Sequence, residues 1–159
     1  DLHEPDDDGW LDPYVPPERW ESDHVPIGRG RTYGDGRDLT IVSFANGLRM
    51  SLRVARRLER RGVSSRVLDL RWLAPLPVDD ILREASATGR VLVADETRRS
   101  GGVSEGVLTA LVDGGFTGAM ARVTSRDSFI PLGPAAGHVL LSEDQIEAAA
   151  VRLTEGEHR

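Results

Sequence analysis

The sequence contains no cysteine and no lysine among its 159 residues. The missing cysteine excludes disulfide bonds, thiolate zinc sites and thiol nucleophiles. All 20 basic residues are arginine, so the chain also has no lysine for Schiff-base chemistry or for a phosphate-binding loop. An all-arginine composition is what a GC-rich genome encodes, and we expect a cytoplasmic bacterial protein.

Long apolar runs and a surplus of positive charge are missing as well. No apolar stretch approaches the roughly 20 residues that span a bilayer, and the chain shows no signal peptide after Asp1, so we expect no membrane partner. The net charge is −6, and nine acidic residues against one arginine in residues 1–24 account for it. The remainder is close to neutral. Neither part has the positive field of a nucleic-acid-binding protein.

Residues 1–24 combine mutually repelling acidic residues with aromatic side chains. Four prolines in this segment disfavour a regular helix or a central strand. Trp10, Tyr14 and Trp20 make it too apolar for a free linker. An extended arm that lays these side chains on a neighbouring surface fits both observations, and a disordered end is the open alternative.

From residue 25 onward, short apolar runs alternate with amphipathic stretches. We expect strands over 25–33, 39–44, 66–70, 90–94 and 119–124, and helices over 46–61, 78–87, 103–112 and after Ser142. This alternation predicts parallel strands joined by right-handed crossovers, with helices on both faces of one sheet. The sequence therefore predicts an α/β domain over 25–159 whose working loops follow the carboxyl ends of the strands.

Residues at the expected helix ends support these boundaries. Asn46 is predicted to cap the first helix, and Gly62 to end it. Ser142 and Gln145 have the spacing of a capping box at the start of the last helix.

Gly34-Asp35-Gly36 has the form of a thiamine-diphosphate motif, in which the aspartate binds Mg²⁺. That motif needs an asparagine farther along the chain, but Asn46 follows after only ten residues. We interpret the tripeptide as a tight turn. The four histidines also lack the spacing of a metal-binding pair.

The loop after the strand at 90–94 contains the most polar candidates. Asp95 and Glu96 are adjacent, so their side chains should point in opposite directions and form no carboxylate pair. Arg98, Arg99 and the helix start at Gly101-Gly102 could bind an anion. Two alternatives stay open for this loop, a contact between subunits and a turn that requires two glycines.

Arginines recur along one face of the helix expected at 46–61. Arg49, Arg53, Arg56 and Arg60 form this stripe, and Arg57 and Arg61 widen it. An acidic partner, including the arm at 1–24, and simple solvation are the two interpretations.

Several stretches in a fixed order resemble the transketolase C-terminal domain family. They are Asp69 to Leu76 (DLRWLAPL), Thr88 to Glu96 (TGRVLVADE), Gly101-Gly102, Arg122-Val123 and Asp127 to Leu132 (DSFIPL). The likeness covers residues 25–154 and is closest to the domain at the end of the beta subunit of the decarboxylating component of 2-oxo-acid dehydrogenases. It implies a three-layer α/β/α sandwich around a five-stranded, mostly parallel sheet with one antiparallel edge strand.

The resemblance also implies a function. Such enzymes bind thiamine diphosphate and Mg²⁺ between other domains, decarboxylate a 2-oxo acid and pass the acyl group to a lipoyl group on an acyltransferase core. In such enzymes this domain contributes subunit contacts, a homodimer contact among them, and part of the surface that docks the core. No catalytic, cofactor or metal residue can be carried over to this chain.

Two functional hypotheses follow. The first is a non-catalytic assembly and docking domain of such a dehydrogenase. The second is a stand-alone anion- or nucleotide-binding domain that uses Arg98, Arg99 and the Gly101-Gly102 helix start. The candidate interface or anion-binding residues are Arg71, Trp72, Glu96, Arg98, Arg99, Gly101, Gly102 and Asp127.

Overall fold

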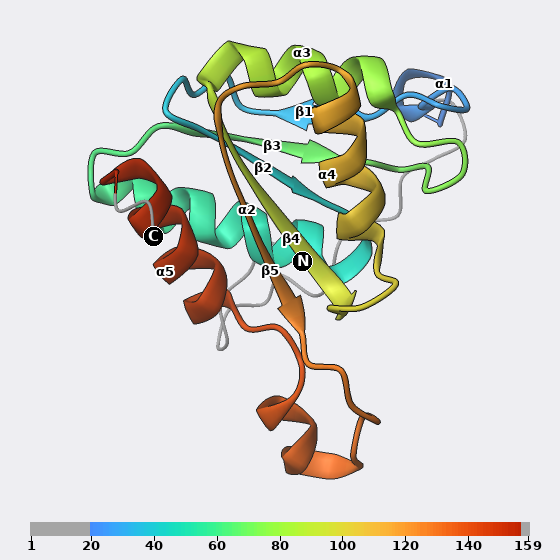
Figure 1. Ribbon diagram of the computed structural model, residues 1–159, viewed down its shortest axis with the longest axis vertical. Helices are drawn as coiled ribbons and strands as arrows, with labels where there is room; N and C mark the ends of the chain where they lie inside the picture. Colours follow the sequence, from blue (N-terminus) through green and yellow to red (C-terminus); the bar gives the residue numbers. More distant parts are fainter. Residues whose placement is uncertain (1–19, 157–159) are drawn as a thin grey trace.

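The computed structural model describes residues 20–156, which form a five-stranded sheet in the order β1-β3-β2-β4-β5 between helices (Figure 1). β1 runs antiparallel to β3 at one edge, and all other neighbouring strands are parallel. The predicted α/β sandwich with one antiparallel edge strand is confirmed. In chain order the elements are α1 Trp20–Asp23, β1 Arg31–Tyr33, β2 Leu39–Ser43, α2 Ala45–Arg60, β3 Ser65–Asp69, α3 Val78–Thr88, β4 Arg90–Arg98, α4 Val103–Asp113, β5 Ala119–Ser125, the 3-10 helix η2 Gly133–His138 and α5 Glu143–Thr154.

Helices cover the sheet on both sides and create two apolar cores. Val54 of α2 and Ile146 of α5 belong to the core on one face. Ile81 of α3 and Val107 of α4 belong to the core on the other. All five residues of β2, in the middle of the sheet, are buried, as expected of a parallel strand covered on both faces. No helix within residues 20–156 is long and apolar enough to cross a membrane.

The ends of α2 and α5 agree only in part with the residues predicted to cap them. The capping box of Ser142 and Gln145 is present, and Gly62 follows α2 with a φ of 81°. The prediction for Asn46 is wrong, because α2 begins one residue earlier and Phe44 occupies the capping position. The backbone N–H of Asn46 instead donates to Glu96, 3.3 Å away and 50 residues later in the chain.

Three other boundaries differ from the prediction by more than one residue. β4 continues to Arg98, beyond the expected end at residue 94. Residues 20–23 form a helical turn where an extended arm was expected, and the rest of that proposed arm lies outside the described residues. β1 has only three residues, because the backbone of Gly30 bonds to the Asp80 side chain of α3 and not to β3.

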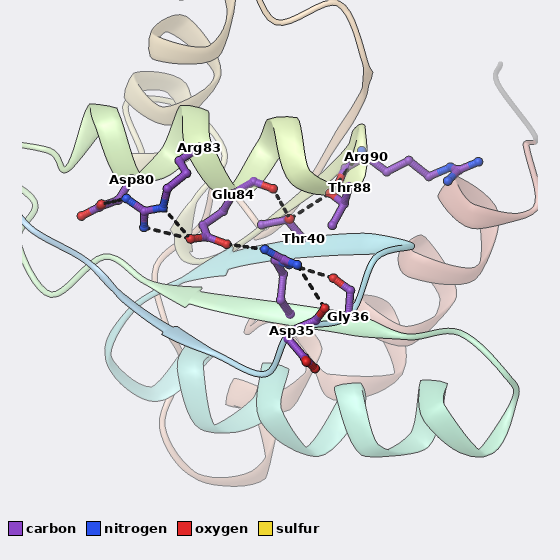
Figure 2. A network of polar contacts seen from close by, with 9 residues as sticks. Asp35, Gly36, Thr40, Asp80, Arg83, Glu84, Thr88 and Arg90 are labelled. Carbon is purple, nitrogen blue, oxygen red and sulfur yellow. Dashed lines mark hydrogen bonds and ion pairs between the residues drawn. The ribbon is translucent and has the colours of Figure 1, made fainter.

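A network of ion pairs ties this antiparallel edge to α3 (Figure 2). Asp80 is 1% exposed and accepts hydrogen bonds from Gly30 N at 2.8 Å, from Arg29 Nε at 2.9 Å and from Arg83. The neighbouring Glu84 accepts a hydrogen bond of 2.8 Å from Arg66 of β3. The buried carboxylates are therefore paired, as burial of charge requires.

The pKa of Asp80 reflects this environment. Burial by itself raises the pKa, but the hydrogen bonds from Gly30 and Arg83 and the charges of Arg83 and Arg29 outweigh it and lower the pKa below its ordinary value. A carboxyl group whose pKa is lower in the folded state stabilises the fold above its unfolded pKa. This stabilisation is lost as the pH falls through the folded value.

We expect Asp80→Asn to lower the free energy of unfolding by about 2 kcal/mol at neutral pH, because Arg29, Arg83 and Gly30 lose a charged acceptor. Urea denaturation measures this change. The difference from the unsubstituted protein should begin to shrink below about pH 4, where the unfolded carboxyl group becomes protonated, and should be lost once the pH falls past the lower folded pKa. The exposed neighbour Asp79 provides the control, and an Asp79→Asn change of equal size would contradict the explanation.

Candidate functional site at the carboxyl edge of the sheet

The parallel strands β2 to β5 all end at one edge of the sheet, and the candidate residues gather along it (Figure 1). Arg71 and Trp72 follow β3, and Asp127 follows β5. Glu96 and Arg98 lie near the end of β4, and Arg99, Gly101 and Gly102 lead from it into α4.

Asp95, fully buried near the end of β4, holds the start of α4. Its Oδ2 atom accepts a hydrogen bond of 2.7 Å from the backbone N–H of Ser104 in the first turn of that helix. Its Oδ1 atom accepts bonds from the N–H and the hydroxyl of Thr97, at 2.8 and 2.6 Å. Gly102, at the capping position, has no side chain for this purpose, so Asp95 stabilises the helix start in its place.

Glu96 points the other way. Its Oε1 atom lies 3.3 Å from the backbone N–H of Asn46 in the first turn of α2. Because α2 and α4 belong to opposite cores, the divergence predicted for Asp95 and Glu96 is confirmed. The two helix starts at this edge are thus held by carboxylates of the chain itself.

The glycines before α4 serve the backbone of the turn. A Cβ atom on Gly102 would lie 2.3 Å from the carbonyl oxygen of Arg98 and 2.7 Å from the hydroxyl of Thr97. Gly101 has a φ of 69°, in the left-handed region that favours glycine. Of the open interpretations, a turn that requires two glycines describes this loop best.

Arg98 and Arg99 do not converge on one site. Arg98 lines a hollow with Ser100 and Phe129, whereas Arg99 lines a separate hollow with Arg122. Asp95 accepts the N–H of Ser104 in the first turn of α4, so this donor of the helix start is already bonded within the chain. The anion site of Arg98, Arg99 and the Gly101-Gly102 helix start stays a prediction.

Asp127 joins the loop after β5 to the loop after β4. Its carboxylate accepts hydrogen bonds from the N–H of Ser100 at 2.9 Å and from the Ser100 hydroxyl at 2.6 Å. The Ser100 hydroxyl bond, followed by the backbone bond, lowers the pKa of Asp127 below its ordinary value. Nearby, the N–H of Arg126 donates to Val139 O at 2.8 Å and closes the base of residues 126–141, here termed the projecting loop.

The projecting loop extends away from the sheet (Figure 1). It carries exposed apolar side chains. Phe129 is 97% exposed, Ile130 65% and Leu132 95%. Contiguous exposed apolar residues on a loop with a fixed base are typical of a protein interface. In the sequence these side chains stand only within the DSFIPL motif, and an apolar run next to a proline and outside every expected strand was the signal that could have marked them as exposed.

Arg71 and Trp72 both contact the chain itself. Arg71 has a φ of 57° and bonds through its N–H and Nε atoms to Asp69, at 3.2 and 3.0 Å. Burial raises the pKa of Asp69 above its ordinary value, and these bonds oppose the shift. The indole N–H of Trp72 donates to Val25 O at 3.3 Å. An interface role for these two residues stays a prediction.

The arginine stripe of α2 faces α5 over part of its length. Glu143 accepts hydrogen bonds from Arg53 at 2.5 Å and from Arg57 at 2.6 Å, and Glu147 accepts one from Arg61 at 3.1 Å. At these positions the stripe meets carboxylates of the same domain and is not a solvated face.

The described residues do not fit thiamine diphosphate or its metal. Arg66 donates to the backbone carbonyls of Asp35 and Gly36, at 3.0 and 2.7 Å, and a Cβ atom on Gly36 would lie 2.3 Å from Ser65 N. The tripeptide at 34–36 lies in the loop between β1 and β2 and packs against β3, with no hydrogen-bonded turn assigned to it. Within residues 20–156 no group of three or more histidine, cysteine, aspartate or glutamate residues could hold a metal ion.

Comparison with known families identifies the domain. Residues 28–151 match the family described as the transketolase C-terminal domain. The chain belongs to this family. The match falls within residues 25–154, over which the sequence motifs indicated the resemblance, so the predicted membership is confirmed.

Relatives of this transketolase C-terminal domain occur in several enzymes. The chain is 32% identical to pyruvate dehydrogenase E1 component subunit beta of Staphylococcus epidermidis over 143 residues. This alignment covers 87% of this chain and 43% of that protein. It is 33% identical over 111 residues to 1-deoxy-D-xylulose-5-phosphate synthase 1 of Geobacter sulfurreducens, covering 69% of this chain and 17% of the synthase. A solved split-gene transketolase, described as an inactive beta4 tetramer, superimposes with a TM-score of 0.75 at 25% identity, over 84% of this chain and 44% of that one. The chain therefore spans less than half the length of these relatives.

For this transketolase C-terminal domain we expect Asp95→Asn to cost about 2 kcal/mol of unfolding free energy, because an amide cannot accept from Thr97 and Ser104 at once. Urea denaturation provides the measurement. Glu96→Gln is the matched control, since an amide oxygen can still accept the one bond from Asn46, and its effect should stay within about 0.5 kcal/mol. A larger loss for Glu96→Gln than for Asp95→Asn would refute the assigned roles.

Proposed function

We propose that this chain is the assembly domain of a thiamine-diphosphate-dependent 2-oxo-acid dehydrogenase of the E1-beta type, and that it carries no reacting groups of its own. The observation that carries this proposal is the projecting loop, whose Phe129 and Leu132 side chains are almost fully exposed. Burying two such side chains against a neighbour contributes roughly 1.5–3 kcal/mol each to association.

The polar groups at the carboxyl edge of the sheet support the proposal that the chain carries no reacting groups of its own. In α/β proteins, ligands commonly bind beyond the carboxyl ends of the strands. Here Asp95 and Glu96 hold helix starts, and Asp127 holds Ser100. These polar groups stabilise the domain and are not left to bind a substrate.

Similarity supports a dehydrogenase over the other activities found in the family. The match to the E1-beta subunit covers 87% of this chain, against 69% for the synthase. In the proposed oxidoreductase, thiamine diphosphate and Mg²⁺ bind to other domains, and a rigid block that joins those domains keeps the reacting atoms in place. A partner that binds only the assembled form shifts the equilibrium toward it and so stabilises that arrangement.

The proposed partners are other domains and subunits of the same dehydrogenase, a second copy of this chain, and the lipoyl acyltransferase core. A subunit role agrees with the relatives, one of which is named as a subunit and another as a tetramer. We place the enzyme in the bacterial cytoplasm, as predicted from composition.

A double substitution of the projecting loop tests the assembly role. Phe129→Ser with Leu132→Ser should leave the melting temperature unchanged, because both side chains are exposed. Co-purification with the thiamine-binding part of the dehydrogenase should fall at least about tenfold, as the loss of about 1.4 kcal/mol or more predicts.

Val112→Ser is the matched control, since Val112 is 61% exposed on α4, away from the projecting loop. It should leave co-purification unchanged. Equal losses for the control and the double variant, or no loss for either, would exclude the projecting loop as the assembly contact.

Titration calorimetry tests the absence of reacting groups. The 159-residue chain, mixed with thiamine diphosphate and Mg²⁺, should show no saturable heat, because the loop at 34–36 is closed by Arg66. Tight Mg²⁺-dependent binding, or turnover of a 2-oxo acid by this chain alone, would overturn this part of the proposal.

A further inference from the structure

Three arginines from separate parts of the chain line one hollow at the open edge of the sheet. Arg99 comes from the loop after β4, Arg122 from the edge strand β5, and Arg152 from the last turn of α5. The hollow has a volume of about 320 Å³. It is distinct from the hollow beside Arg98 and from the projecting loop.

Arg122 is the fixed member of this group. Its side chain is only 20% exposed, and its Nη1 atom donates to the carbonyl oxygen of Arg99 at 3.1 Å and lies 3.4 Å from the hydroxyl of Ser104. The guanidinium of Arg122 therefore holds the backbone of Arg99 beside it without any ligand.

The arginines of the hollow are poorly matched by carboxylates, unlike Arg57 and Arg66, which have carboxylate oxygens at 2.6 and 2.8 Å. Within the described residues Arg122 pairs with Glu105, 49% exposed and 3.7 Å away, and neither Arg99 nor Arg152 forms an ion pair. Three guanidinium groups against one carboxylate leave two positive charges.

Helix α5 leaves space for a ligand. Gln145, Ala148 and Arg152 follow one another at helical spacing and all line the hollow. Ala148 is exposed and small, so it forms a floor without filling the volume. The Oε1 atom of Gln145 accepts the Ser142 N–H, which leaves the amide nitrogen of Gln145 as a donor.

We propose that Arg99, Arg122 and Arg152 bind the phosphate group of a small phosphorylated molecule. A phosphate dianion balances the two unpaired charges, and its tetrahedral oxygens can accept from several guanidinium groups at once. A planar carboxylate presents one charge and two oxygens, and fits three converging arginines less well. This site is independent of the assembly role.

Protection of the sheet edge is a simpler explanation for these arginines. Charged side chains on an edge strand also prevent pairing with a strand of another molecule. That role requires charge at the open edge of β5 but no shared hollow, and it predicts no preference among anions. Selectivity for phosphate therefore separates the two explanations.

The experiment is titration calorimetry of the 159-residue chain with inorganic phosphate at constant ionic strength, with malonate as the dicarboxylate probe. We expect saturable binding of phosphate and at least about fivefold weaker binding of malonate. Arg152→Gln should weaken phosphate binding about tenfold, the effect of one lost charge-assisted hydrogen bond. Ala148→Glu should abolish it, because the glutamate fills the hollow and cancels charge.

Controls keep the test independent of folding and of net charge. Ala148 and Arg152 are exposed, so both variants should retain the melting temperature of the parent chain. Arg56→Gln removes the same charge from an exposed position on α2 and should leave the phosphate affinity unchanged. The proposal is overturned by the absence of saturable phosphate binding, by equal affinity for malonate, by an equal effect of Arg56→Gln, or by undiminished binding in Ala148→Glu.

Discussion

Adjacent side chains of an extended strand point to opposite faces of a sheet, and the two carboxylates near the end of β4 depend on this constraint. Asp95 reaches the first turn of α4, and Glu96 reaches the first turn of α2. Because these helices pack into different cores, two neighbouring residues connect both helical layers to the sheet. They also occupy the backbone donors at which α/β proteins commonly hold phosphate groups.

The arginines, which are the sole basic residues of the chain, also connect several elements through one side chain. A guanidinium group can bond to several acceptors at once, and Arg66 bonds to Glu84 and to the carbonyls of Asp35 and Gly36. Arg53 and Arg57 share Glu143 and join α2 to α5. Arg99, Arg122 and Arg152, by contrast, line one hollow, and we propose that they bind a phosphate group there.

In the relatives of this transketolase C-terminal domain, the matching part makes up less than half of a longer protein. A domain whose polar edge groups bond to one another, and whose two most exposed large apolar side chains, Phe129 and Leu132, lie on one projecting loop, is suited to contact with a neighbour. The hydrogen bond between Arg126 and Val139 closes the base of the projecting loop, and Phe129 and Leu132 lie within this closed segment.

Local patterns in the sequence determined the alternation of strands and helices, the capping box at Ser142 and the divergence of Asp95 and Glu96. Each of these depends on residues within a few positions of one another, where side-chain direction follows directly from backbone geometry. Tertiary structure alone decided that Phe44 and not Asn46 caps α2, that Arg98 and Arg99 separate, and that Arg99 meets Arg122 and Arg152. These outcomes depend on contacts between residues about 20 to 50 positions apart, and no local periodicity records which distant groups the folded chain brings together.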